Sequence, residues 1–141
     1  MRRIATIEEQ LILHEGLKLK PYRCTAGKLT IGVGRNLDDK GISKEEALFL
    51  LANDIEDAIK DLSNFDWFEG LDPVRKKVVI DMRYNLGPTR FRQFKRMIAA
   101  LAAGDYKAAA AEMVNSKWYY QVGTRARRLM EMMRTGEDYG K

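Results

Sequence analysis

Residues 15–35 of the chain read EGLKLKPYRCTAGKLTIGVGR, and this stretch decides how the N-terminal half is organised. Eight residues lie between Glu15 and Cys24, and five lie between Cys24 and Thr30. The pattern predicts a helix that ends at Glu15, followed by a short β-hairpin that carries Cys24 and Thr30. A helix terminus and both hairpin strands can then line one cleft, which we interpret as a candidate site.

The helix before this stretch has clear boundaries. Thr6 and Glu9 form a capping-box pattern, apolar residues recur at helical spacing as far as Ile12, and Gly16 is a natural stop. Glu15 then lies beside the apolar face and at the negative end of the helix, and both effects favour a protonated, partly buried acid. The commoner alternative for a glutamate at a helix end is plain exposure to solvent.

The hairpin is expected between Leu17 and Val33, where apolar residues alternate with others and residues 25–28 (TAGK) supply the turn. Gly32 and Gly34 weaken a strand, and glycines in such places mark a close approach of backbone or ligand. A GxGxxG nucleotide site is excluded, because Leu37 stands three residues after Gly34.

The rest of the chain reads as helices. Ser43 and Glu46 form a second capping box that starts one long helix, which ends near Ser63 and connects two lobes of different composition. The second half is predicted to be all helical, with an α+β, mainly α, fold class for the whole chain. Its helices are expected at about residues 73–86, 91–101, 105–115 and 125–134.

Composition narrows the class of protein. A chain of 141 residues with 45% hydrophobic residues fits one domain with a packed core. Residues 1–65 carry 10 Lys and Arg against 11 Asp and Glu, whereas residues 66–141 carry 15 against 9. The basic second half attracts polyanions, which include nucleic acid, membrane surfaces and the bacterial wall. For the last, arginine-rich helix a solvated surface is an equally good explanation.

Some kinds of site and location are excluded. One cysteine allows no internal disulfide or thiolate zinc site, and with a lone His14 we expect no metal and no cofactor. The apolar runs are shorter than a membrane span, and MRRIATIEEQ turns acidic where a signal peptide is apolar. We therefore expect a soluble protein made in the cytoplasm.

Three segments carry a family resemblance: EGLKLKPYRCTAGKLTIGVGR, VRKKVVIDMRYNLG, and SKWYYQVGTRARR followed by RTG. With them the chain resembles the bacteriophage lysozymes (endolysins) of glycoside hydrolase family 24, the T-even phage type. The resemblance implies a single lysozyme-like domain over 1–141, with an N-terminal lobe at about 15–63 and a C-terminal lobe at about 64–141 on which residues 1–14 pack. It also implies a muramidase that cleaves peptidoglycan between N-acetylmuramic acid and N-acetylglucosamine.

The resemblance assigns roles to individual residues. Glu15 matches the general acid, Cys24 stands where many members have Asp, and Thr30 matches the threonine that positions the attacking water. Arg35 stands where the family commonly has His, so an ion pair built on that His is absent. Other positions match glycan contacts: Tyr84, Asn85, Asn36 and Arg125, the last of which also ion-pairs with the acid, together with Met97 and Glu112.

Cys24 is the important departure, because glycosidases usually need two carboxylates. A free thiol has a pKa of about 8.5, so that value must fall before a thiolate acts as base, nucleophile or charge stabiliser, and Arg23 and Lys28 are candidates to lower it. The alternative is an inert, packed thiol.

Two other functional classes stay open beside the muramidase. A lysozyme-like protein that binds peptidoglycan without cleaving it is one, and a basic nucleic-acid binder with a pI near 9.3 is the other, which leaves Glu15, Thr30 and Arg125 unexplained. We favour the muramidase, a monomer that binds glycan strands and no nucleic acid. We expect it to stay in the cytoplasm of the infected host until a holin releases it to the periplasmic cell wall.

Overall fold

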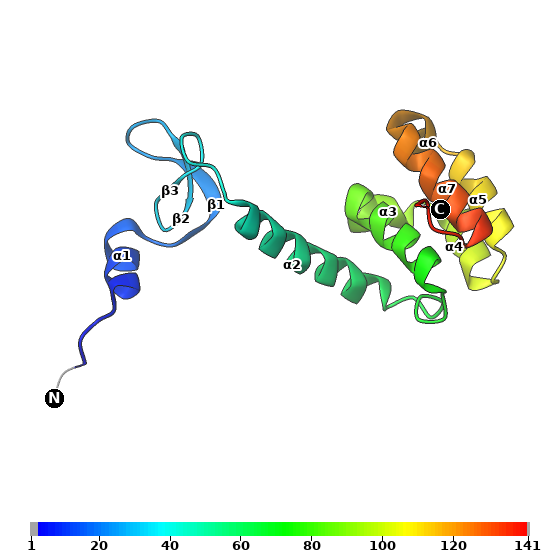
Figure 1. Cartoon of the computed structure of the whole chain (residues 1–141), viewed down its shortest axis with the longest axis horizontal. Coiled ribbons are helices and arrows are strands. Elements are labelled where there is room, and N and C mark those ends of the chain that lie inside the picture. The colour runs from blue at the N-terminus through cyan, green and yellow to red at the C-terminus, as the bar shows by residue number, and fades with distance from the viewer. Residues whose placement is uncertain (1–2, 141) are drawn as a thin grey trace. The chain divides into compact units, whose positions relative to one another are not determined.

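The structure is a computed structural model of the chain that describes residues 3–140. It contains two compact units, one ending at Leu50 and the other beginning at Leu51, so the boundary lies within helix α2 (Lys44–Leu62). The predicted α+β, mainly α, fold class is confirmed, with a small sheet in the first unit and helices in the second (Figure 1). The lobe limit near residue 63 and the packing of residues 1–14 on the C-terminal helices stay predictions.

Helix α1 (Ile7–Glu15) has the predicted capping box. Thr6 Oγ1 accepts a hydrogen bond from the Glu9 N–H at 3.1 Å, and Glu9 Oε1 accepts one from the Thr6 N–H at 3.2 Å. The helix ends at Gly16, whose φ of 80° is unfavourable for other residues. No residue of α1 is buried, so its apolar positions are at most partly covered within this unit.

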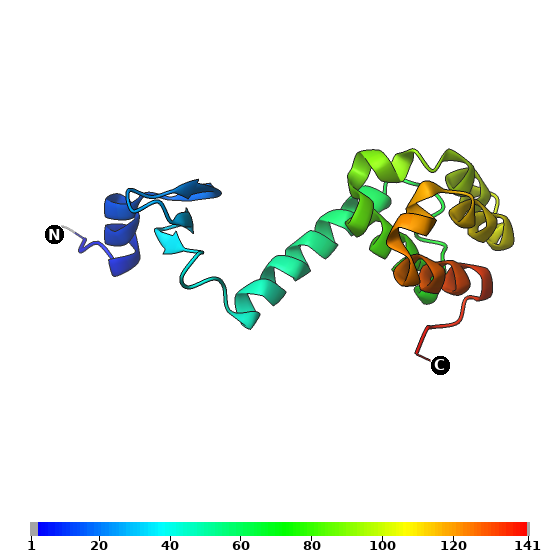
Figure 2. The same ribbon diagram turned by 90° about the horizontal axis from the view of Figure 1, so that it is seen from above.

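The sheet contains β1 (Lys18–Arg23), β2 (Leu29–Gly32) and β3 (Arg35–Asn36), antiparallel in that order (Figure 2). The predicted hairpin is confirmed, while β3 was not expected. Thr30 lies at the centre of the register, opposite Tyr22 on β1 and Asn36 on β3. A two-residue strand has no alternation of its own, which is why its sequence gave no strand signal.

Arg35 connects the sheet to the start of α2. Its two terminal nitrogens each donate to a Glu46 carboxylate oxygen at 2.8 Å, and Glu46 also accepts from the Ser43 N–H in the predicted capping box. The hydrogen bond from Arg35 is the largest cause that lowers the pKa of Glu46 to about 2. An arginine at this position therefore builds a local ion pair of its own.

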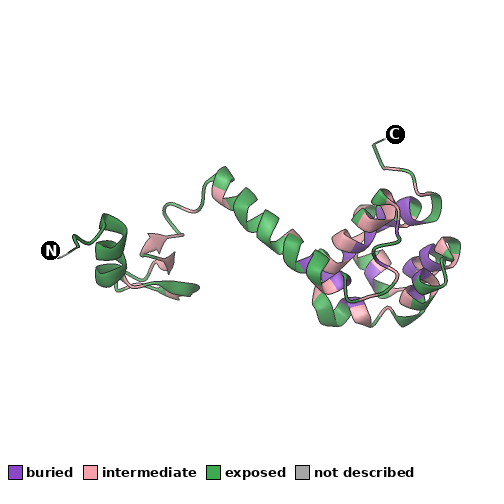
Figure 3. Cartoon of the chain, turned by 90° about the horizontal axis from the view of Figure 1, so that it is seen from below, coloured by how far each residue is buried: buried purple, intermediate pink, exposed green. Residues whose placement is uncertain are grey.

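In the part of the chain that the structure describes, the second unit contains five further helices (Figure 3). The helix predicted at about residues 73–86 ends at Gly87 as expected, where φ is 81° and ψ is 172°, and Pro88 begins a short second piece. This piece contains Phe91, so the next predicted helix starts later than expected, at Lys95. The six-residue helix α6 was not predicted, because it is too short to show a period. The five are α3 (Pro73–Arg92), α4 (Lys95–Ala102), α5 (Tyr106–Val114), α6 (Lys117–Val122) and α7 (Thr124–Thr135).

The core of this unit is built from one apolar face of each helix. The methionines fill it as expected, with Met97, Met113 and Met133 fully buried. Ala109 and Ala110 are buried where α5 packs against α7, so the alanine run allows a close helix approach. Among residues 3–140, no helix combines the length and apolar character that crossing a bilayer requires.

Asp61, near the end of α2, is held by two arginines of α3. Arg83 Nε donates to its carboxylate at 2.6 Å, and Arg92 donates from two nitrogens at 2.7 and 3.0 Å. The hydrogen bonds from Arg92 are the largest cause that lowers the pKa of Asp61 to about 2. The carboxylate thereby fixes the end of α2 against both pieces of α3.

We expect Asp61→Asn to destabilise the protein by roughly 1–3 kcal/mol at pH 7, because it leaves two arginines without their anion. The folded-state pKa lies below the ordinary value of 3.8, so this stabilisation is complete above about pH 4 and is lost as the pH falls towards 2. Urea unfolding between pH 7 and 2 measures both effects, with Asp54→Asn on the exposed side of α2 as control. A difference from the unmodified protein that stays constant with pH would contradict the assignment.

Candidate active site

Glu15 lies at the last position of α1 with its side chain against Gly34. A Cβ added to Gly34 would collide with Glu15 Oε2 and lie 3.1 Å from Cδ, and Gly34 also has a φ of +68°. The positive φ favours glycine, and a larger residue would displace the flexible end of the Glu15 side chain. Gly34 thus marks a close approach, but the approaching group is the Glu15 side chain and not the backbone or ligand expected from the sequence.

Glu15 is exposed in the structure. The partial burial expected from the sequence is not provided by the N-terminal unit, whose one buried residue among positions 3–50 is Thr30.

Thr30 is a buried residue with a defined hydroxyl orientation. Its Oγ1 donates to the Lys28 carbonyl at 2.8 Å, and the side chain is 3% exposed. A hydroxyl has one proton and two lone pairs, so Thr30 keeps acceptor capacity after making this bond. It can thus accept a hydrogen bond from a water molecule and orient it.

Cys24 lies in the turn that closes the hairpin, where its N–H donates to the Lys28 carbonyl at 3.0 Å. The thiol is partly exposed. Hydrogen bonds from the backbone N–H groups of Lys28, the largest cause, and of Ala26 lower the pKa of Cys24. The arrangement stabilises a thiolate, and it brings Cys24 and Thr30 together as predicted.

The groups that lower the pKa of Cys24 are not the cations expected from the sequence. The Arg23 side chain donates to the Gly27 carbonyl at 3.1 Å, and the Lys28 ammonium pairs with Asp39 at 3.2 Å. Neither cation is among the causes that lower the pKa of Cys24. The backbone N–H groups of a tight turn do this instead, and residue types alone do not reveal them.

Asn36 lies next to Thr30 across the sheet, but its amide is already used. The Nδ2 group donates to Asp39 Oδ2 and Oδ1 accepts from the Asp39 N–H, both at 3.0 Å. These bonds give Asn36 a structural role in the turn after β3. Its predicted contact with glycan stays a prediction.

The other predicted residues belong to the C-terminal unit. Arg125 Nε donates to Asp81 Oδ1 at 2.7 Å, and Asn85 Oδ1 accepts from Trp118 Nε1 at 2.8 Å, while Tyr84 is exposed. The implied ion pair of Arg125 with Glu15 joins residues of two units and stays a prediction. Met97 is buried in the core, and Glu112 is partly exposed.

Residues 15–34 therefore combine an acid, a thiol with a lowered pKa and a buried hydroxyl in one unit. These groups are suited to acid–base chemistry on a polar substrate. Within the part of the chain that the structure describes, no three His, Cys, Asp or Glu residues are grouped so that they could hold a metal ion.

The comparison with protein families gives one match over most of the chain. The family model described as phage lysozyme matches residues 13–135, a range that includes Glu15, Cys24, Thr30 and Arg125. The chain belongs to the phage lysozyme family. The site described above thus lies in the part of this phage lysozyme that the family shares.

Individual relatives agree with the family. A probable T4-type lysozyme 1 of Dictyostelium discoideum is 27% identical over 94% of this chain and 96% of that protein. An endolysin of Acyrthosiphon pisum secondary endosymbiont phage 1 is 33% identical over 79% of this chain and 77% of that protein. A SAR-endolysin of Escherichia phage Mu is 28% identical over 86% of this chain and 71% of that protein.

We expect Gly34→Ala to reduce wall lysis by about 100-fold, because the new Cβ displaces the Glu15 carboxyl group and misplaced catalytic groups lose rates of this size. Gly32→Ala is the matched control, since Gly32 has nearly the same φ, +69°, but nothing within 4 Å of its added Cβ. Each alanine costs about 1–2 kcal/mol of stability in this conformation. Clearing rates of wall suspensions and urea unfolding measure the two effects, and equal rates for both variants would contradict the role of Gly34.

Proposed function

We propose that this phage lysozyme is a muramidase that hydrolyses the β-1,4 bond between N-acetylmuramic acid and N-acetylglucosamine in bacterial peptidoglycan. The observation that carries the proposal is the placement of Glu15 against Gly34 in the same unit as Cys24 and Thr30. The names of the relatives, lysozyme and endolysin, support this substrate.

Glu15 acts as the general acid. Its carboxyl group gives a proton to the glycosidic oxygen while the bond to the anomeric carbon breaks and an oxocarbenium-like charge develops on the sugar. Exposure of Glu15 on its own unit leaves the carboxyl group accessible to a glycan strand. Gly34 supports one side of it, so that the acid is positioned without a covering side chain.

Thr30 and Cys24 manage the attacking water. The water donates one hydrogen bond to Thr30 Oγ1 and the other to the Cys24 thiolate. These two bonds direct a lone pair of the water oxygen at the anomeric carbon. As the new C–O bond forms, Cys24 accepts the proton of the water and becomes a thiol. Glu15 ends as a carboxylate, and exchange with solvent restores both groups.

The remaining predicted residues bind the glycan. Tyr84 and Asn85 are exposed on α3, where a ring face and an amide suit sugar rings and acetamido groups. We place Asn36 and Arg125 among the glycan contacts as well. Because Trp118 Nε1 donates to Asn85 Oδ1, the Nδ2 end of the Asn85 amide is the one left for a sugar.

In its biological setting the proposed enzyme is an endolysin. It accumulates as a monomer in the cytoplasm of the infected bacterium, depends on a holin for release, and degrades the periplasmic cell wall so that the host lyses. The basic C-terminal half favours adsorption to the anionic wall.

We expect Glu15→Gln to lower the rate of wall lysis by about 10²- to 10⁴-fold while the fold stays intact, because an amide keeps the shape but has no acidic proton. Glu8→Gln, an exposed glutamate of the same helix, is the matched control and should retain the rate. Turbidity of outer-membrane-stripped Gram-negative cells measures lysis, and circular dichroism checks the fold. Substantial lysis by folded Glu15→Gln protein would disprove the acid assignment.

A second candidate is a lysozyme-like protein that binds peptidoglycan without cleaving it, and the observation in its favour is the thiol at position 24. If the thiolate is the base, Cys24→Asp keeps substantial activity because the turn N–H groups also stabilise a carboxylate, whereas Cys24→Ser loses about 10²-fold or more. Lysis rates and binding to insoluble walls measure both properties. Wall binding without lysis by the unmodified protein would establish the second candidate, and full activity of Cys24→Ser would make Cys24 a bystander.

A further inference from the structure

Residues 64–67 (NFDW) follow α2 in a tight loop, and together with Ala102 they line a surface pocket of about 530 Å³. All of these residues belong to the C-terminal unit. The volume lies within the range of roughly 300–1,000 Å³ that is usual for ligand pockets. None of the residues proposed above to bind or cleave glycan lines this pocket.

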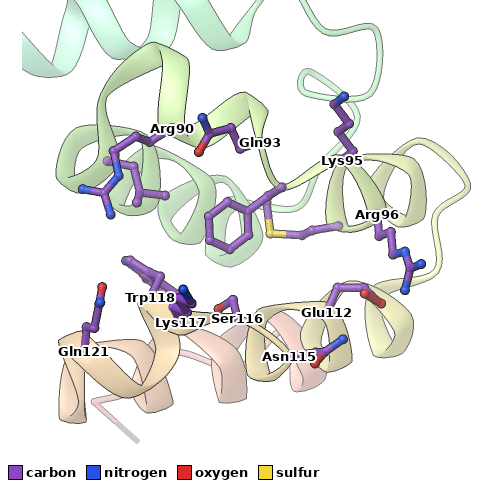
Figure 4. A pocket seen from close by; sticks show the side chains of 13 residues that line it. Arg90, Gln93, Lys95, Arg96, Glu112, Asn115, Ser116, Lys117, Trp118 and Gln121 are labelled. Carbon is purple, nitrogen blue, oxygen red and sulfur yellow. The ribbon is translucent and has the colours of Figure 1, made fainter.

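A larger cavity of the same unit, of about 610 Å³, opens at the other end of α4 (Figure 4). Met97 and Glu112, which match glycan contacts of the family, line that cavity, so it belongs to the glycan-binding surface already proposed. Ala102 is the last residue of α4, about 10 Å along the helix from Lys95 at its start. The pocket at residues 64–67 is therefore separate from the cavity, whose lining includes four cations: Arg90, Lys95, Arg96 and Lys117.

Two aromatic rings form the apolar wall of the pocket. Phe65 and Trp67 stack with their ring centroids 5.0 Å apart and an angle of 26° between the planes, and both residues are partly exposed. Phe68 meets Trp67 edge-on at 6.5 Å, and the Arg92 guanidinium lies 5.0 Å from the Phe65 ring centroid. These contacts hold the rings in place before a ligand binds, which lowers the entropic cost of binding.

Three polar groups beside the rings have unused hydrogen-bonding capacity. In the part of the chain that the structure describes, the Asp66 carboxylate has no hydrogen-bond or ion-pair partner, and Trp67 Nε1 donates to no acceptor. The Asn64 amide donates from Nδ2 to the Asp61 carbonyl at 3.1 Å, which leaves Oδ1 as an acceptor. The pocket thus offers two acceptors and one donor beside an aromatic surface.

The chemistry of these groups selects a sugar as the ligand. A sugar ring has an apolar face that packs on an aromatic ring, and its hydroxyl groups both donate and accept hydrogen bonds. No Lys or Arg is among the described residues that line the pocket, and the Asp66 carboxylate repels anions, which disfavours phosphates and nucleic acid. An ammonium group suits the rings and the carboxylate, but it only donates, so it leaves the Trp67 N–H unpaired.

We propose that residues 64–67 form a second glycan-binding site, which takes a neutral sugar of the strand, N-acetylglucosamine. The identity of the glycan rests on the muramidase function proposed above. The sugar ring packs on Trp67, its hydroxyl groups donate to Asp66 and Asn64 Oδ1, and one of its oxygens accepts from Trp67 Nε1. Such a site keeps the enzyme attached to the insoluble wall between cleavage events.

Nuclear magnetic resonance titration of ¹⁵N-labelled Glu15→Gln protein tests the site, with a peptide-free tetrasaccharide of alternating N-acetylglucosamine and N-acetylmuramic acid as the probe. The substitution slows hydrolysis during the titration. The chain has two tryptophans, so its two indole N–H signals report separately on Trp67 and on Trp118, which donates to Asn85. We expect the Trp67 signal to shift with the tetrasaccharide, because its N–H gains an acceptor.

Two aspartate variants in the same Glu15→Gln background show whether the pocket itself binds. We expect Asp66→Ala to weaken binding at the Trp67 signal by about tenfold, because hydrogen bonds to a charged group are lost. Asp54→Ala removes an exposed carboxylate of the same unit outside the pocket and should change binding by less than about twofold. Trp67→Phe assigns the two signals, and thermal melting checks that each variant is folded.

Several results would overturn the second site. An unchanged Trp67 signal, equal losses in Asp66→Ala and Asp54→Ala, or an equal shift with Nα-acetyl-lysine amide would each exclude a specific sugar site. Wall lysis by the unmodified protein is measured separately. Lysis without a Trp67 response disproves the second site alone, whereas a Trp67 response without lysis disproves the muramidase and keeps the sugar site.

Discussion

The Glu15 side chain occupies its position because residue 34 has no Cβ. Gly34 must follow β2 in a left-handed conformation, which turns the chain so that Arg35 and Asn36 pair with β2 as a third strand. Arg35 then reaches Glu46 and fixes the start of α2. Glycine at position 34 thus affects the position of the acid, the third strand of the sheet and, through Arg35, the start of the long helix.

Local signals predicted most elements of the fold. The capping boxes at Thr6 and Ser43, the stop at Gly16 and the break at Gly87 each depend on a few neighbouring residues, and the structure confirms all four. β3 and α6 are too short to show a period, so no local signal separated them from loop. The hydrogen bonds made by backbone groups were not predictable from residue types, for example those that the N–H groups of the turn donate to Cys24.

The candidate site shows the same division. Residue types and spacing predicted that Cys24 and Thr30 share one hairpin, and the pairing register brings them together. The partners of Arg125 and Asn85 were not predictable, because Asp81 and Trp118 belong to contacts between helices that no sequence period encodes. The charge asymmetry was visible in the sequence, but the separation into paired cations and a cluster around one cavity was not.

The stabilisation of the Cys24 thiolate by main-chain groups has an evolutionary consequence. Backbone N–H groups are present whatever side chain occupies a position, so the anion-stabilising surroundings at residue 24 do not depend on other substitutions. A carboxylate can therefore replace the thiol here without a change in the backbone of the turn. The backbone of the hairpin thus stabilises an anion at residue 24, whether that anion is a thiolate or a carboxylate.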